Sequence, residues 1–168
     1  MKRHILSILI LALVLASCSD SSEVSEAYNK YRLKDGVTTV SVPGWLIHLA
    51  AGIADLEESE KELLESIDKV KVIAVDDAEL NAEINLHEEF YSKIRENNNY
   101  EELLVVRDDD ESVTIFGIMD EKVIKEMLIL VGGSDDNALV YIKGNISPDI
   151  LNDQIDLSEP DRFLSLKF

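Results

Sequence analysis

Apolar residues follow three different patterns along the chain. A mostly apolar run covers residues 5–15, shortly after the basic residues Lys2 and Arg3. Further along, apolar residues recur at the three- and four-residue spacing of helices, and the second half holds short β-branched runs separated by acidic or glycine-rich turns. Each pattern predicts its own kind of element: a leader, amphipathic helices and strands.

The N-terminal run predicts a signal peptide. A helix rises about 1.5 Å per residue, so residues 5–15 would cross only about half of a ~30 Å hydrocarbon core, too little for a transmembrane helix. The run ends in Leu15-Ala16-Ser17-Cys18, which resembles the lipobox of bacterial lipoprotein signal peptides. In such proteins the cysteine receives diacylglycerol and the chain is cut before it. We therefore expect a signal peptide at 1–17 and lipid on Cys18; an ordinary secretory signal is the alternative.

Cys18 is the only cysteine of the chain. An odd cysteine in an exported protein needs an explanation, and lipid attachment supplies one. The following residues, 18–35, are mostly polar and predict a lipidated flexible tether, within which 24–33 could form a short helix.

Residues 36–168 predict a single α+β domain. Strands are expected at 37–42, 70–75, 103–106, 113–116, 127–131 and 139–142, and helices at 45–56, around 63–67, at 80–94 and briefly at 148–152. Acidic and glycine-rich turns join the last four strands into two hairpins. Helices early and hairpins late predict an antiparallel or mixed sheet with two to four helices packed on one face.

Several of these segments together resemble a known family. They are the lipobox, the strand ending in Val42-Pro43, the strand at 70–75, and the closing pattern of residues 128–146 with Gly144 after the last strand. The chain resembles the Bacteroidetes lipoprotein family catalogued as domain of unknown function 4252. The resemblance implies an envelope location, but it implies no activity and supplies no functional residues.

Charge narrows the possible partners. The chain has 16 basic and 34 acidic residues, a formal charge of −18. Removing residues 1–17 takes away Lys2 and Arg3 and leaves −20. Such a charge repels phosphates, so nucleic-acid binding is excluded and adhesion to an anionic bilayer is left to the lipid.

The chain lacks phosphate-binding, dinucleotide-binding, nucleophile-elbow and zinc-protease motifs, so no catalytic residue and no cofactor is predicted. His87 lies on the apolar stripe of the 80–94 helix, which indicates a hydrogen-bonded histidine at the edge of the core rather than a general base. His48 is expected at solvent or at the sheet margin. Trp45 shares a helical face with Leu46, Leu49, Ile53 and Leu56, which predicts a core anchor.

Two acidic turns are weak candidates for a cation site, because Ca²⁺ prefers several oxygen ligands. They contain Asp108, Asp109 and Asp110, and Asp135 and Asp136. Consecutive acids in a tight turn point in different directions, however, so we expect solvated turns and no bound metal.

These observations predict a membrane-anchored envelope lipoprotein that acts as a non-catalytic protein-interaction module. Its partners would be a membrane, through lipid on Cys18, and an envelope protein. The outer membrane is favoured over the inner one, with the side left open. The alternatives are a small-ligand or cation-binding lipoprotein and a hydrolase with an unrecognised carboxylate site.

Overall fold

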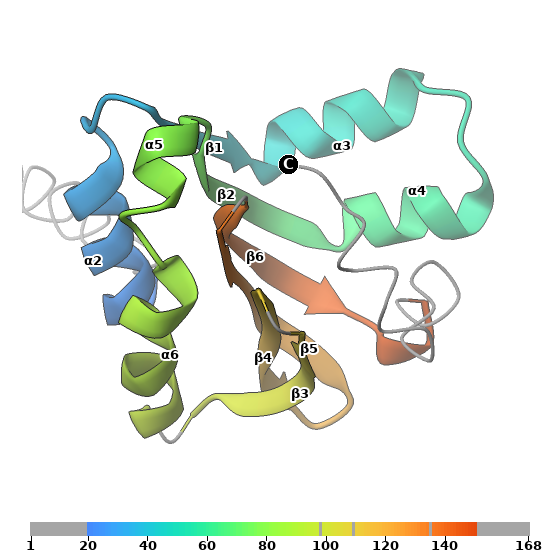
Figure 1. The fold of residues 1–168 in the computed structure, drawn as a ribbon. Helices are drawn as coiled ribbons and strands as arrows, with labels where there is room; N and C mark the ends of the chain where they lie inside the picture. Colours follow the sequence, from blue (N-terminus) through green and yellow to red (C-terminus); the bar gives the residue numbers. More distant parts are fainter. Residues whose placement is uncertain (1–19, 98, 109, 135, 151–168) are drawn as a thin grey trace, which may run out of the picture.

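The computed structural model describes residues 20–97, 99–108, 110–134 and 136–150 of the chain. Helices and strands alternate early, and strands follow one another late (Figure 1). In chain order the elements are α2 (Ser22–Tyr31), β1 (Val37–Pro43), α3 (Gly44–Ile53), α4 (Glu58–Glu65), β2 (Ile67–Val75), α5 (Ala78–Asn81), α6 (Leu86–Glu96), β3 (Glu101–Arg107), β4 (Glu111–Asp120), β5 (Val123–Gly133) and β6 (Asn137–Ile146).

The strands form one six-stranded sheet in the order β1-β2-β6-β5-β4-β3. Every neighbouring pair is antiparallel, which confirms the predicted α+β class and selects the antiparallel sheet. The β3–β4 and β5–β6 hairpins are present as predicted. Strands β4 and β5 also form a hairpin, with residues 121–122 as its turn.

The two ends of the sheet differ in what they carry. At one end Pro43 of β1 pairs with Lys69 of β2, and α3 begins at the next residue; we term this the α3 end. At the other end Val37 pairs with Val75, and Glu111 of β4 lies opposite Gly133 of β5. The acidic turns around 108–110 and 134–136 therefore lie at this opposite end, which we term the turn end.

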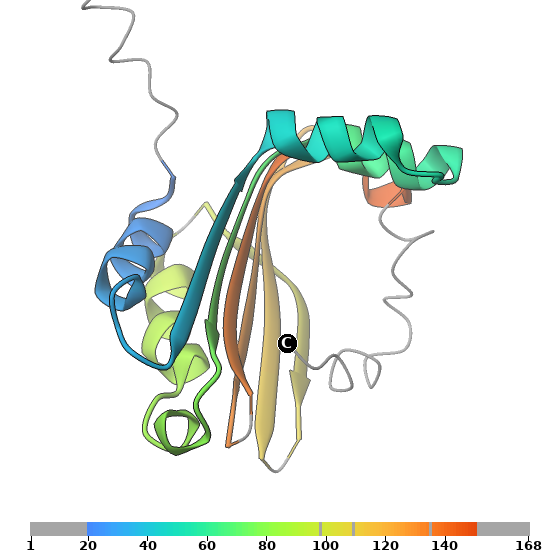
Figure 2. The same ribbon diagram turned by 90° about the horizontal axis from the view of Figure 1, so that it is seen from above.

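Helices α2, α5 and α6 cover one face of the sheet (Figure 2). The largest side chains buried between them and the sheet are Tyr31, Ile73, Leu86, Phe90, Ile94, Phe116, Leu128, Leu130, Leu139 and Tyr141. The predicted 80–94 helix is divided into α5 and α6. It breaks because the Asn85 side chain caps α6 by accepting a hydrogen bond from Glu88 N at 2.9 Å.

The sequence prediction placed the helices on one face, but α3 and α4 lie toward the other (Figure 2). The physical reason is that the strands are apolar on both faces. Along β5, Leu128 and Leu130 belong to the cluster under α6, whereas Met127 and Val131 belong to a second cluster with Ile47 of α3. Two apolar faces both need cover, so helices are required on both sides.

Helix α2 lies in the segment predicted as part of the flexible tether at 18–35. The structure differs because Val24, Ala27 and Tyr31 follow helical spacing and are buried, and Tyr31 packs edge-on against Phe90 of α6 with ring centroids 6.5 Å apart. The Tyr31 hydroxyl also donates a 2.6 Å hydrogen bond to Glu89. The folded domain therefore includes residues from Asp20 onward, and little of the predicted tether is left.

Candidate interaction surface

Helix α3 carries the most exposed group of large apolar side chains. Trp45 is 69% exposed, Leu46 43%, Leu49 55% and Ile53 81%. The prediction that Trp45 anchors the core is therefore wrong, and the face that it shares with Leu46, Leu49 and Ile53 points outward.

The opposite side of α3 holds the helix to the sheet. Gly44 and Ala51 are buried there, and Ile47 is half-buried in the second apolar cluster. A Cβ atom at Gly44 would lie 2.7 Å from the carbonyl oxygen of Asp68, so only glycine allows the helix to start this close to β2. Small residues therefore face the sheet, and the large apolar residues face away from it.

The ring of His48 fixes the same helix. Its Nε2 donates to the carbonyl oxygen of Ile67 at 2.9 Å, so His48 lies at the sheet margin, as one of its two predicted positions. The outer face of α3 is thus a rigidly held surface. Its four side chains expose on the order of 500 Å² of apolar area, within the range of the largest patch on an ordinary monomer and often functional.

Acidic residues of the next helix lie beside this surface. Helix α4, which follows α3 after a short loop, carries exposed Glu58, Glu62 and Glu65 and is opened by a capping box between Glu57 and Glu60. On the other side α3 continues from the edge strand β1, where Val40 is also exposed. We define the outer face of α3 as Trp45, Leu46, Leu49 and Ile53.

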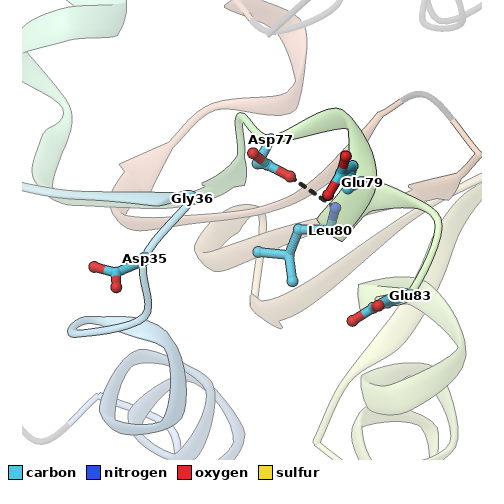
Figure 3. A pocket seen from close by; sticks show the side chains of 6 residues that line it. All are labelled: Asp35, Gly36, Asp77, Glu79, Leu80 and Glu83. Carbon is cyan, nitrogen blue, oxygen red and sulfur yellow. Dashed lines mark hydrogen bonds between the residues drawn. The ribbon is translucent and has the colours of Figure 1, made fainter.

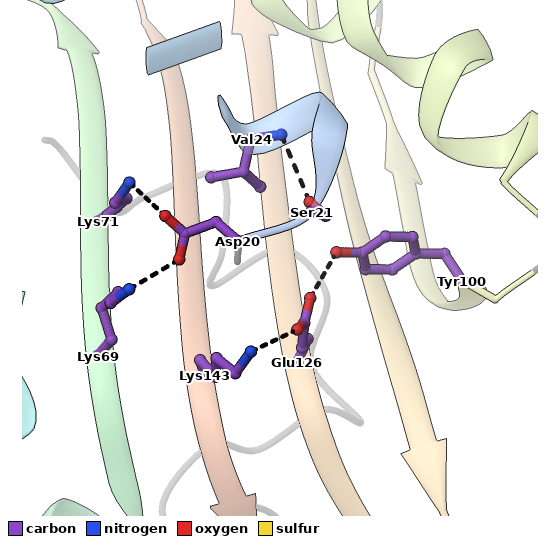
Figure 4. A network of polar contacts seen from close by, with 8 residues as sticks. All are labelled: Asp20, Ser21, Val24, Lys69, Lys71, Tyr100, Glu126 and Lys143. Atoms are coloured by element: carbon purple, nitrogen blue, oxygen red, sulfur yellow. Dashed lines mark hydrogen bonds and ion pairs between the residues drawn. The ribbon is translucent and has the colours of Figure 1, made fainter. Parts of the chain in front are cut away.

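A polar network fastens the start of the described chain to the sheet near the α3 end (Figure 4). Lys69 Nζ donates to Asp20 Oδ1 at 2.9 Å, and Lys71 Nζ donates to Asp20 Oδ2 at 2.6 Å. Burial raises the pKa of Asp20, but the hydrogen bonds from Lys71 and Lys69 outweigh it, and the pKa lies below its usual value. The carboxylate is therefore charged at neutral pH and holds the N-terminal residues against β2.

The network continues across β5 and β6. Glu126 accepts from Lys143 at 3.2 Å and from the Tyr100 hydroxyl at 3.0 Å (Figure 4). Asp20 and Glu126 are each neutralised by lysine, and neither forms the pair of facing carboxylic acids that a hydrolase of this kind would need. The hydrolase alternative gains no support from this cluster.

Three of the five weak metal candidates lie among the described residues. Asp109 and Asp135 lie outside the described residues, and Asp108, Asp110 and Asp136 lie in turns at the turn end. Across the ranges that the structure describes, no group of three or more His, Cys, Asp or Glu side chains is arranged to hold a metal ion.

A shallow cavity of about 280 Å³ also lies at the turn end (Figure 3). Its lining is Asp35, Gly36, Asp77, Glu79, Leu80 and Glu83. The carboxylate of Asp77 has a structural role: its Oδ1 accepts a 2.9 Å hydrogen bond from Leu80 N and so caps the N-terminus of α5. The carboxylates of Asp35 and Glu83 lie on opposite sides of Leu80 rather than converging (Figure 3). The small-ligand alternative gains little from this cavity.

His87 also has a structural role. It is buried, its Nε2 hydrogen-bonds Thr114 Oγ1 at 2.8 Å, and its ring stacks on Tyr91 with centroids 5.1 Å apart. Burial lowers its pKa, and the nearby Arg107 lowers it further. The prediction of a hydrogen-bonded histidine at the edge of the core is confirmed.

Cys18 lies outside the described residues, two positions before Asp20. Within the described part of the chain, no helix has the length and hydrophobicity needed to cross a bilayer.

The fold and this surface define a class of protein: an antiparallel α+β domain that presents one exposed apolar helix at the end of the sheet where Asp20 is bound. The family model described as "Domain of unknown function (DUF4252)" matches residues 31–153, and the chain belongs to this family. No curated protein matches the chain. No solved structure matches it either. The match begins at Tyr31, the last residue of α2, so most of this helix lies outside it.

Proposed function

We propose that this protein is a lipoprotein of the bacterial cell envelope, anchored through lipid on Cys18, whose domain acts by binding rather than by catalysis. The proposal that the domain binds a partner rests on one observation: the large apolar side chains on the outer face of α3 are exposed. Large apolar side chains are costly to leave in water, and the largest apolar patch on a monomer is often functional.

The position of the domain in the chain supports the anchor. Cleavage before Cys18 would remove no described residue, because the described fold starts at Asp20. It would also leave the lipid-bearing residue two positions from the Asp20 ion pairs with Lys69 and Lys71. The predicted processing site thus lies two positions before the first described residue.

The ion pairs and hydrogen bonds made by the least exposed acidic side chains of the ion pairs and by the described histidines support a non-catalytic role. Asp20 and Glu126, whose side chains are 11% and 14% exposed, are paired with lysines, and both described histidines make hydrogen bonds that hold the fold. A catalytic site needs a tuned acid, base or nucleophile facing a substrate cavity, and these carboxylates and histidines are instead engaged with other residues of the fold.

The anchor is tested on the native product. We expect mass spectrometry of the purified protein to show a chain that begins at Cys18 and carries diacylglycerol, and we expect Cys18→Ala to be released from membranes on lysis. A native chain that begins at Met1, or one with an unmodified Cys18 thiol, would refute the anchor.

The binding surface is tested separately by a photoreactive amino acid placed in the native protein in cells. We expect adducts with an envelope component when it replaces Leu49, on the outer face of α3. The matched control is Leu33, which is 86% exposed and lies between α2 and β1, toward the turn end. Equal labelling from both positions, or none from Leu49, would contradict the assignment of the surface.

A further inference from the structure

We propose that the outer face of α3 binds the lipid bilayer itself, as a second membrane contact beside the anchor. The inference deepens the proposed function by naming what α3 binds, and it rests on the proposed lipid on Cys18 for the closeness of the membrane. The alternatives to the bilayer as the binding partner of this face are a second copy of the chain and an envelope protein.

The first argument is where the chain leaves the described structure. Asp20 is held by Lys69, and Lys69 pairs with Pro43, the residue directly before α3. Only Ser19 stands between Asp20 and Cys18, and two residues of extended chain span at most about 7 Å. A lipid on Cys18 would therefore hold the α3 end of the sheet at the membrane surface, whereas a flexible tether over residues 18–35 would have let the domain move freely.

The second argument is the chemistry of α3. None of its ten residues is charged, and its only ionisable side chain, His48, is occupied by the Ile67 carbonyl. Trp45, Leu49 and Ile53 follow one another at four-residue spacing, which places them in a row along one side of the helix. Tryptophan is favoured at bilayer interfaces, where its ring is partly apolar and its N–H remains hydrated. A helix of this kind can lie in the interface without crossing it.

The third argument is the distribution of charge. The acidic turns and the cavity lined by Asp35, Asp77 and Glu83 lie at the turn end, away from α3, so this orientation keeps much of the negative charge far from the lipid head groups. The carboxylates of α4 remain beside α3. Binding should therefore be strongest on zwitterionic lipids and should weaken as anionic lipid is added.

Charge also argues against a second copy as the occupant. The chain from Cys18 onward has a formal charge of −20, and pairing two α3 helices would bring two acidic α4 helices together. A zwitterionic bilayer offers apolar surface without this repulsion.

Trp45 makes the contact directly measurable, because it is the only tryptophan in the chain. The purified lipidated protein is reconstituted into phosphatidylcholine–phosphatidylethanolamine vesicles, with and without brominated acyl chains. We expect the Trp45 emission to shift to shorter wavelength and to be quenched by the brominated lipid. The double variant Leu49→Asp/Ile53→Asp should lose most of the quenching, whereas Leu33→Asp should keep it.

The unlipidated Cys18→Ala chain, produced without residues 1–17 so that the apolar run at 5–15 cannot insert, separates this inference from the anchor. We expect it to partition weakly onto the same vesicles, and the Leu49→Asp/Ile53→Asp change to weaken this partitioning at least about tenfold, since each fully buried leucine or isoleucine side chain contributes about that factor. Melting temperatures of the variants, matched to Leu33→Asp, exclude unfolding as the cause.

Each unfavourable result has its own meaning. A lipidated protein whose Trp45 is not quenched overturns the bilayer contact and leaves the anchor intact. An unmodified Cys18 overturns the anchor, and the Cys18→Ala partitioning then decides the bilayer contact alone. Short-wavelength Trp45 emission before vesicles are added, or crosslinks from Leu49 to protein rather than lipid, would show that another occupant covers α3.

Discussion

Replacing Asp20 by alanine should lower the free energy of unfolding by about 2–3 kcal/mol. The Asp20 side chain is 11% exposed and pairs with Lys71 at 2.6 Å and Lys69 at 2.9 Å. Removing one partner of a buried ion pair costs roughly 3–5 kcal/mol, because it leaves a charge without its counterion. We place the expected loss below that range because Lys69 can turn toward water, and because Lys71 keeps its contact over the Tyr28 ring, 4.5 Å from its centroid.

The matched control is an exposed ion pair. Glu65 lies 3.9 Å from Lys61 on α4, and both side chains are well exposed, so Glu65→Ala should cost at most about 0.5 kcal/mol. Both variants are compared with the wild-type chain by urea denaturation followed by far-UV circular dichroism. An Asp20→Ala loss no larger than that of Glu65→Ala would show that the N-terminal residues are not held against β2.

The pH dependence gives a second check on the same residue. The folded-state pKa of Asp20 is below its usual value of 3.8, so its contribution is complete above that value and is lost as the pH falls through the folded-state pKa. We expect the difference between wild type and Asp20→Ala to be constant near neutral pH and to shrink in acid. A difference that grows on acidification would refute the reasoning.

Three further predictions concern the rest of the fold. Asn137→Ala should cost about 2–4 kcal/mol in urea denaturation, because the buried Asn137 side chain accepts from Leu86 N at 2.9 Å and donates to the Gly133 carbonyl at 2.9 Å. Burial lowers the pKa of His87 below 6.5, so stability should fall as the pH drops through that value and below it, and His87→Phe should flatten this part of the urea-midpoint profile. Millimolar Ca²⁺ should raise the melting temperature by only about a degree or two through charge screening, and a large saturable rise would instead reveal a cation site.

The exposed face of α3 shows what a hydrophobic pattern can and cannot predict. The helix itself was predicted, because Trp45, Leu49 and Ile53 follow helical spacing. Its orientation was not, because the inner side is built from Gly44 and Ala51, which carry little hydrophobic signal. The larger side chains seemed to mark the core, but close approach to β2 favours small residues on the buried side.

Helix α2 was underestimated for the opposite reason. Its segment is mostly polar, and only three residues, Val24, Ala27 and Tyr31, are buried. Such a helix has little stability of its own and depends on a partner, here α6, whose position in the fold cannot be read from the local sequence. Local patterns did predict the β3–β4 and β5–β6 hairpins, since strand, turn and strand are adjacent in the chain. The pairing of β2 with β6 joins distant segments and was not predicted.

If the chain is exported as proposed, the fastening of Asp20 to β2 would also set an order of events during export. In the proposed lipoprotein, the enzymes that modify Cys18 and cut before it act at the membrane, on a residue only two positions from these ion pairs. Once α2 has docked on α6, the body of the domain would crowd that residue. Maturation of the N-terminus should therefore come before α2 settles, so that a chain which folds too early would escape acylation.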